Sequence, residues 1–330
     1  MAFPSPSGPN SYIWKLKDVY NARLGNNWPN YISSYGFFIG GESPASPATT
    51  NTIQWINIPS TGNATDFGDL LAGASSNQSS SASTTRGLNA MGYSPNDVTT
   101  TNSIQYFTFS TQGNAVDFGD TTQARTRSAG ASSETRGVFC GGQDPNSNTM
   151  DYVTIASTGN AADFGDQINS VGGSANMVNS PTRGIIGGGG NPGRTNVIQY
   201  ITIASTGNAT DFGDLLAGNI ILGGVSSNTR GVFAGGNDGP GVINVIQYIT
   251  IASTGNATDF GDLTVTRAGV GGVSNSIRGV FGGGQNPVVT NTLDYITITT
   301  TGNAIDFGDM LTTTDGEYGT ASGSHGGISS

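Results

Sequence analysis

Pairs of carboxylates recur along this chain, and their residue type could bind a metal ion. The sequence DFGD occurs six times, with first carboxylates at Asp66, Asp117, Asp163, Asp211, Asp259 and Asp306. Two Asp residues per copy are few for calcium, which takes about six to eight oxygen ligands. We interpret DFGD as a turn in which the first Asp caps backbone N–H groups, the Phe packs between repeats and the Gly adopts a special φ. DFG also occurs in protein kinases, but the glycine-rich loop and strand lysine of a kinase are missing here.

A second charged group recurs ahead of five DFGD copies. These arginines are Arg86, Arg136, Arg183, Arg230 and Arg278. They could form a ring around an anionic ligand. Because the Arg-bearing turns and the DFGD turns are expected on one face, we predict instead that the arginines form salt bridges with the DFGD carboxylates.

Residues suited to catalysis are scarce outside the repeats. The chain has one cysteine, Cys140, so an intrachain disulfide is impossible, and one histidine, His325, in a Gly/Ser-rich tail. No Ser/His/Asp or Cys/His set stands out, and almost every Arg and Asp belongs to a repeat. We therefore predict a protein that is not an enzyme and that binds no cofactor or metal.

The recurring groups belong to six tandem units. Successive DFGD copies start 51, 46, 48, 48 and 47 residues apart, and Asn196–Leu215 is identical to Asn244–Leu263. Each unit holds, in constant order, an apolar run ending in glycines, a segment such as VIQYITI, and DFGD. Units of this length with little helical periodicity are typical of β-propeller blades.

One unit predicts four antiparallel strands. Arg230–Gly236 is short, β-branched and aromatic, and Val245–Ser253 is rich in Val, Ile, Tyr and Thr, which favours strands. An outer strand follows the turn at Thr254–Asn256, and the small residues of Arg267–Asn275 suit an innermost strand. We predict an all-β protein: residues 31–330 form a six-bladed β-propeller of four-stranded blades, after an N-terminal segment, residues 1–30. The C-terminal strand Glu317–Ser324 closes the ring beside Phe37–Gly41, which removes exposed sheet edges.

The charge of the chain limits its partners. The net charge is −10, and 12 of the 22 acidic residues belong to the DFGD copies. Without a basic stripe, a nucleic-acid partner is not expected. No run of about 18 apolar residues is present, so membrane insertion is not expected. The N-terminus lacks the features of a secretory signal, which predicts synthesis in a cytoplasm.

The repeats resemble the kelch family of propellers, through the paired glycines that end the second strand and the aromatic QY or DY in the third. They depart from kelch in having the Phe and Leu of DFGDL where a fourth-strand Trp is expected. TDFGD is also similar to a degenerate Asp-box of sialidase-type propellers. The kelch resemblance implies a propeller fold, and an oxidase of that family would need copper with two His residues, which one His cannot supply.

The N-terminal segment Tyr12–Pro29 resembles a segment near the N-termini of tailed-phage structural proteins, especially marine ones. Its apolar residues could share one helical face, and a lone short helix must dock on something to be stable. We predict that Trp14, Tyr20 and Trp28 contact the outside of the propeller or a neighbouring chain.

The loops after the paired glycines differ between units, whereas the surrounding scaffold is copied. They are Glu42–Asn51, Tyr93–Asn102, Gln143–Thr149, Asn191–Asn196, Asn237–Asn244 and Gln285–Asn291. Free drift of exposed loops is the plain alternative, but we predict that recognition lies here. Their amides, hydroxyls and prolines suit glycan hydroxyls or a wet protein contact better than an anion. The candidate residues are Glu42, Ser43, Pro44, Tyr93, Pro95, Asn96, Asp97, Gln143, Asp144, Asn191, Arg194, Asn237, Asp238, Gln285 and Asn286.

Taken together, these features favour a phage virion protein, present in multiple copies. Residues 1–30 would attach it to other virion proteins of a tail, neck fibre or capsid, and the propeller would bind neighbouring subunits or a host-surface glycan or protein. The alternatives are a cellular kelch-like interaction adaptor and, less favoured, a carbohydrate-active enzyme.

Overall fold

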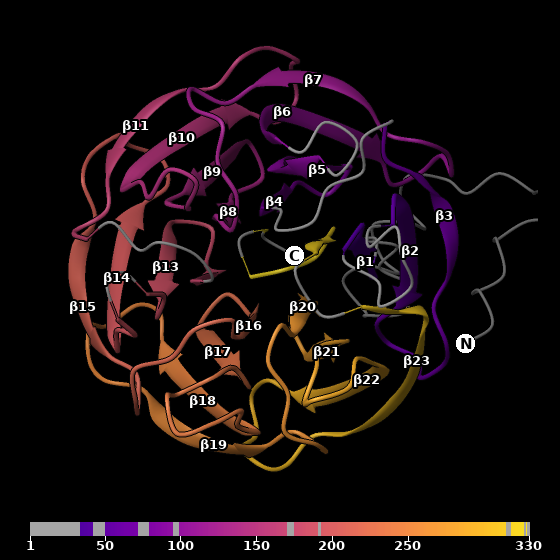
Figure 1. The fold of residues 1–330 in the computed structure, drawn as a ribbon, viewed down its shortest axis with the longest axis vertical. Helices are drawn as coiled ribbons and strands as arrows, with labels where there is room; N and C mark the ends of the chain where they lie inside the picture. Colours follow the sequence, from indigo (N-terminus) through magenta and orange to yellow (C-terminus); the bar gives the residue numbers. More distant parts are fainter. Residues whose placement is uncertain are drawn as a thin grey trace, which may run out of the picture. The chain divides into compact units, whose positions relative to one another are not determined.

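The computed structural model describes residues 34–41, 50–71, 79–94, 99–169, 175–190, 193–314, 318–326 and 328. These residues form six four-stranded antiparallel sheets arranged as blades around a central axis (Figure 1). The predicted six-bladed all-β propeller is confirmed. The segment 1–30, with Trp14, Tyr20 and Trp28, lies outside the described residues.

Each blade contributes one strand to each of four concentric layers. The inner strands are β24 (Gly319–Ser322), β4 (Ser79–Ala82), β8 (Ala129–Ser132), β12 (Asn176–Asn179), β16 (Gly223–Ser226) and β20 (Gly271–Ser274). The second strands are β1 (Tyr35–Ile39), β5 (Arg86–Ser94), β9 (Arg136–Cys140), β13 (Arg183–Gly187), β17 (Arg230–Ala234) and β21 (Arg278–Gly282). The third strands are β2 (Thr52–Asn57), β6 (Thr99–Thr108), β10 (Thr149–Thr154), β14 (Val197–Thr202), β18 (Val245–Thr250) and β22 (Thr290–Thr297). The outer strands are β3 (Thr65–Asp69), β7 (Val116–Asp120), β11 (Ala162–Asp166), β15 (Thr210–Asp214), β19 (Thr258–Asp262) and β23 (Ile305–Thr314).

The inner strands consist mostly of small residues because neighbouring blades crowd together near the axis. A Cβ atom added to Gly272 of β20 would lie 2.1 Å from the carbonyl oxygen of Gly224 in β16. Real Cβ atoms do not approach an oxygen this closely, so only glycine fits there. Small side chains are therefore a requirement of ring geometry.

The hydrophobic core lies between adjacent blades. Phe260 of β19 is 3% exposed and packs in one cluster with Ile296, Ile298 and Ala304 of the next blade. The other five DFGD phenylalanines are buried as well. The prediction that this Phe packs between repeats is confirmed, and the apolar contacts of each blade are completed by its neighbour.

The C-terminal strand closes the ring as predicted. β24 pairs antiparallel with β1, from Gly36 opposite Ser322 to Ile39 opposite Gly319. Figure 1 shows β24 beside β1 near the centre of the ring. Tyr318, just before β24, donates a hydrogen bond to Gly282 O and accepts one from Gly271 N–H at 3.1 Å. This side chain ties the sixth blade to the closing strand.

Candidate functional site

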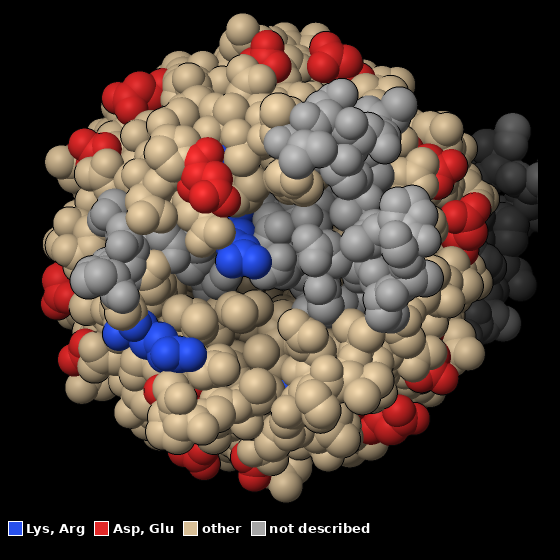
Figure 2. All heavy atoms as spheres, viewed as in Figure 1, with Lys and Arg blue, Asp and Glu red and all other residues tan. Residues whose placement is uncertain are grey.

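The propeller has two faces with different chemistry. The turn face carries the turns between inner and second strands, such as Ser227–Thr229, and those between third and outer strands, such as Ser253–Ala257. The loop face carries the loops that follow the paired glycines. Figure 2 views the loop face, which is largely uncharged, with acidic residues gathered at the rim. We call the contact between successive blades a junction.

The DFGD segments form part of every junction. Gly255 N–H donates to Phe212 O at 2.8 Å, and Ala257 N–H donates to Asp214 O at 2.8 Å, so the turn of one blade covers the outer edge of the preceding blade. Gly213 has φ 149°, and a Cβ there would lie 2.5 Å from Gly255 O. DFGD lies in the outer strands, such as β15 (Thr210–Asp214), so the prediction that it forms a turn is wrong, whereas the special φ predicted for its glycine is confirmed.

The cap at this joint comes from asparagine rather than aspartate. Asn256 Oδ1 accepts a hydrogen bond from the backbone N–H of Asp214 at 3.1 Å. The carboxylate of Asp211, the first Asp of that copy, is exposed. The prediction that the first Asp caps backbone groups is therefore wrong, because an asparagine of the neighbouring blade accepts the hydrogen bond from this backbone N–H. The equivalent caps are Asn63, Asn114, Asn160, Asn208 and Asn303.

The recurring arginines do not pair with the DFGD carboxylates. Arg230 stacks over the ring of Tyr248, 4.2 Å from its centroid, and its Nη1 donates to Ile298 O of the next blade at 2.9 Å. Arg86, Arg136, Arg183 and Arg278 make the same two contacts. The salt-bridge prediction is wrong because each guanidinium is held by a tyrosine of its own blade and a carbonyl of the next. These arginines connect blades.

One junction replaces this arginine with aromatic residues. The first blade has Tyr35 at the arginine position, edge-on to Trp55 with ring centroids 4.4 Å apart. Phe109 of the second blade stacks on Phe37 at 4.7 Å. Since apolar packing can take the place of the arginine, its role at the other junctions is to join blades.

Two junctions contain buried ion pairs that sequence reasoning missed. Arg267 Nη2 lies 2.7 Å from Asp294 Oδ2, and both side chains are at most 1% exposed. Arg125 pairs with Asp151 at 2.5 Å, also fully buried. The signal was present in the sequence: DY replaces QY in the third strand only in the third and sixth units, where an Arg precedes the inner strand.

An axial cavity of about 100 Å³ lies within the ring of inner strands. The described residues that line it are rich in hydroxyl groups and include no Asp, Glu, Lys or Arg. The serine that ends an inner strand accepts a hydrogen bond from a backbone N–H of the preceding blade: Ser226 N–H donates to Ser274 Oγ at 3.2 Å, and Ala82 N–H donates to Ser132 Oγ at 3.0 Å. These bonds reinforce the ring near its axis.

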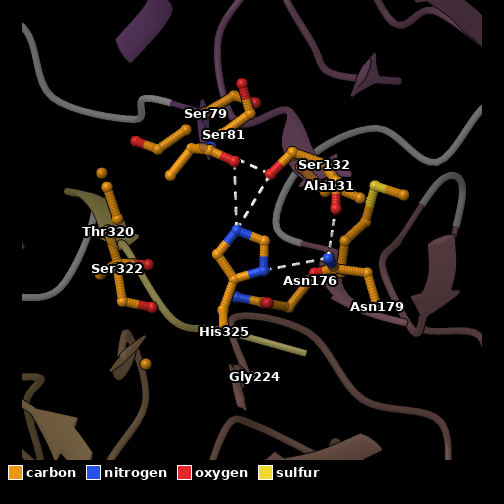
Figure 3. A pocket seen from close by; sticks show the side chains of 18 of the residues that line it. Ser79, Ser81, Ala131, Ser132, Asn176, Asn179, Gly224, Thr320, Ser322 and His325 are labelled. Atoms are coloured by element: carbon orange, nitrogen blue, oxygen red, sulfur yellow. Dashed lines mark hydrogen bonds between the residues drawn. The ribbon is translucent and has the colours of Figure 1, made fainter. Parts of the chain in front are cut away.

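His325 lies against this cavity, between Ser132 and Asn179 (Figure 3). Asn179 Nδ2 donates to His325 Nδ1 at 3.1 Å, so Nε2 carries the proton and donates to Ala82 O at 3.2 Å. Burial lowers the pKa of His325 from 6.5 to about 4, which the hydrogen bond to Ala82 O partly opposes. The neutral ring thus joins three blades from within the tail.

The cysteine is not suited to act as a nucleophile. Cys140 is buried in the second strand of the third blade. Burial raises the pKa of its thiol far above the ordinary value, so the reactive thiolate is disfavoured. Among the described residues, no group of three or more His, Cys, Asp or Glu side chains could hold a metal ion. These residues likewise include no helix able to span a membrane.

Tyr93 lies in β5 rather than in a loop, and the other described recognition candidates lie in loops whose backbones are fixed. Gln143, Asn237 and Gln285 each form an isolated β-bridge with the linker ahead of the inner strand of the same blade. Asp144, Arg194, Gln285 and Asn286 are exposed, whereas Tyr93, Gln143, Asn237 and Asp238 are half-buried. The remaining candidates, Glu42, Ser43, Pro44, Pro95, Asn96, Asp97 and Asn191, lie outside the described residues.

Comparison of this chain with protein families and with curated proteins found no match. The six-bladed ring is consistent with the kelch-like character of the repeats. A propeller of this construction suggests a role in protein interaction, because it presents loops on a rigid ring.

Proposed function

We propose that this protein is a structural or adhesion protein of a tailed-phage virion. Its propeller binds neighbouring virion proteins or host-surface glycans through the loop face. The observation that carries this proposal is the contrast between junctions, whose contacts recur, and loops, which differ on the same scaffold. Groups copied for packing leave the loop face as the surface free for recognition.

The structure favours binding because its recurring arginines already have partners in the fold. The five recurring arginines join blades, and Arg125 and Arg267 pair with buried carboxylates. His325 is held by hydrogen bonds to three blades. A catalytic site would need a set of reactive groups beyond these.

The assignment to a virion rests on the resemblance of Tyr12–Pro29 to phage structural proteins. If it is correct, residues 1–30 attach the propeller to a tail, neck or capsid partner, and the protein is found in purified particles. Removing residues 1–30 then leaves a folded propeller that is absent from particles, as measured by mass spectrometry of virions. Normal incorporation of the truncated protein would contradict the docking role.

Exchange of loops tests the role of the loop face. Replacing both Glu42–Asn51 and Tyr93–Asn102 with the short loop Asn191–Asn196 removes the two longest loops. We expect loss of cell binding or of particle assembly. Because Thr99–Thr101 pair with the end of β5, a urea unfolding curve of the variant must show that the propeller is still folded. If binding and assembly both remain intact, the loop face is not the recognition surface.

The second candidate function is that of a cellular kelch-like interaction adaptor. It would be favoured if the protein is absent from particles and captures one cellular protein.

A further inference from the structure

Arg194 stands apart from the other described arginines. It lies in the loop between β13 and β14, on the loop face, and no other unit has an arginine at an equivalent loop position. Of the eight other described arginines, five join blades, two form buried ion pairs, and Arg127 is half-buried, so Arg194 is the exposed one. In a chain whose charges are mostly copied from unit to unit, an exposed charge that occurs once is not explained by the repeat.

The structure holds the guanidinium of Arg194 in one orientation. Nε donates to Asn237 O at 3.1 Å, and Nη2 donates to Asn237 Oδ1 at 2.8 Å. Asn237 belongs to the next blade and is itself fixed, because its backbone bridges Ile220 and its Oδ1 also accepts from Gly239 N–H at 3.0 Å. The loops of the fourth and fifth blades therefore share one rigid connection.

These contacts occupy one edge of the guanidinium. Because Nε and Nη2 are engaged by Asn237, the edge formed by Nη1 and the second N–H of Nη2 faces away from these contacts. The side chain is exposed. The neighbouring Asp238 carboxylate accepts a hydrogen bond from Gly241 N–H at 3.2 Å, and it forms no ion pair with Arg194. Two parallel N–H groups of this kind match two oxygens of a carboxylate, sulfate or phosphate.

We propose that Arg194 binds the oxyanion of an acidic saccharide on the loop face. This inference rests on the proposed function and specifies its ligand class. It also revises the sequence-based expectation that the loops suit neutral hydroxyls better than anions. Pre-organisation by Asn237 reduces the conformational entropy that the arginine loses on binding, which favours a specific contact over a general charge effect.

The test uses the full chain on an array of sialylated, sulfated and phosphorylated oligosaccharides, each beside its neutral parent. We expect the wild type to prefer at least one acidic member over its parent. Arg194→Gln should weaken that binding about tenfold, and Arg194→Lys should weaken it several-fold because a lysine keeps the charge without the paired N–H groups. Arg127→Gln, which removes the same charge from a half-buried arginine outside this loop, should leave it unchanged.

The three outcomes that overturn this inference differ in what they imply for the proposed function. Equal losses for Arg194→Gln and Arg127→Gln would show a net-charge effect. If the protein binds neutral sugars and Arg194→Gln does not change this binding, the proposal of an acidic ligand is wrong, whereas the proposed adhesion role is still supported. If the protein binds no member of the array, and assembly is intact after the loop exchange, both proposals are wrong. Melting curves of each variant report whether a loss comes from unfolding.

Discussion

The junctions and the loop face differ in how far their contacts recur from blade to blade. At the junction between the fourth and fifth blades, the backbone bonds of Gly255 and Ala257 and the cap by Asn256 join the two blades, and the same contacts recur around the ring. On the loop face, Asp144 contacts Thr126, Arg194 contacts Asn237, and Asn286 contacts Thr266, so three blades use three different side-chain contacts. Identity at a junction therefore reports packing, whereas the contacts of the loop face are not repeated from blade to blade.

The junctions themselves differ in one buried group. In the fifth blade, Gln247 Oε1 accepts from Leu216 N–H at 2.8 Å, and Asn219 Nδ2 donates to Gly235 O at 2.9 Å. In the sixth blade, Asp294 accepts from Thr264, and Arg267 donates to Asp294 and to Gly283 O. One backbone arrangement is thus satisfied by a neutral set or by an ionic set.

The largest effect on stability is expected from disrupting the buried ion pair of Arg267 and Asp294. Arg267→Ala leaves the Asp294 carboxylate buried without its cation, which costs about 3–5 kcal/mol of the free energy of unfolding. Urea denaturation measures this loss. The matched control, Thr264→Leu with Arg267→Asn and Asp294→Gln, installs the neutral set of the fifth blade and should change stability by less than about 1 kcal/mol. A control as unstable as Arg267→Ala would show that the two sets are not interchangeable.

Substitution of the DFGD glycine at a junction is expected to reduce stability nearly as much. A Cβ on Gly261 would lie 2.5 Å from Gly302 O, at φ 145°, so Gly261→Ala should cost about 3 kcal/mol. Gly255→Ala has a similar φ, 155°, but meets nothing within 4 Å, and should cost about 1 kcal/mol. Gly193→Ala on the loop face also meets nothing within 4 Å, has no strained φ and should be close to neutral. If all three variants unfold at the same denaturant concentration, close blade contact does not explain the glycine of DFGD.

Much of the architecture was accessible from the sequence because it depends on repeated small and apolar residues. The blade number, the four strands, the closing strand and the buried Phe all follow from periodicity and residue size. The role of the arginines was not accessible. Arg230 bonds a backbone carbonyl, Ile298 O, and carbonyls leave no trace in residue identity. The sequence predicted a cap by the first Asp of DFGD, such as Asp211, because this residue type caps backbone N–H groups. Asn256 caps instead because the next blade brings its amide oxygen to the N–H of Asp214.

Within the candidate site, the sequence located the loops but not their geometry. It identified Arg194 and Asn237 as members of separate loops, 43 residues apart. Their contact arises because the ring brings successive loops to one face. The ionic set could have been found, since Asp294 occurs in a unit that also carries Arg267, whereas Gln247 occurs with Asn219. A position-by-position comparison of the third, fifth and sixth units shows that Asp occurs with Arg and Gln with Asn at these two positions.

A smaller effect is expected from an arginine that joins blades. Arg230→Ala removes the stacking on Tyr248 and the bond to Ile298 O, contacts that are partly exposed to solvent. We expect a loss of about 1–2 kcal/mol in the free energy of unfolding, measured in urea. The first junction, which has Tyr35 in this position, supplies the comparison: Tyr35→Arg should not raise stability, because Phe109 and Trp55 already fill the site. A gain in that variant would contradict the equivalence of the two arrangements.

The histidine in the tail predicts a pH dependence. Its pKa is lowered to about 4 in the folded protein, against an ordinary value of 6.5. The unfolded chain therefore binds the proton first, so stability falls as pH decreases from about 6.5 and the loss is complete below about 4. Thermal melts of wild type and His325→Gln across this range should converge at low pH, because the variant lacks this titration. Parallel curves would show that other groups cause the acid sensitivity.

The smallest effect on stability is expected at the tip of a loop, and there the two regions separate most clearly. Val288 is 73% exposed, in the loop between β21 and β22, and the loop is held by the bridges of Gln285 with Ala268 and Val289. Val288→Ser removes little buried area and should change the free energy of unfolding by less than about 0.5 kcal/mol. A loss of binding or assembly in this variant, with an unchanged urea midpoint, would place function in the positions that packing does not fix. Loss of stability instead would mean that the loops belong to the scaffold, and the contrast between the two regions would disappear.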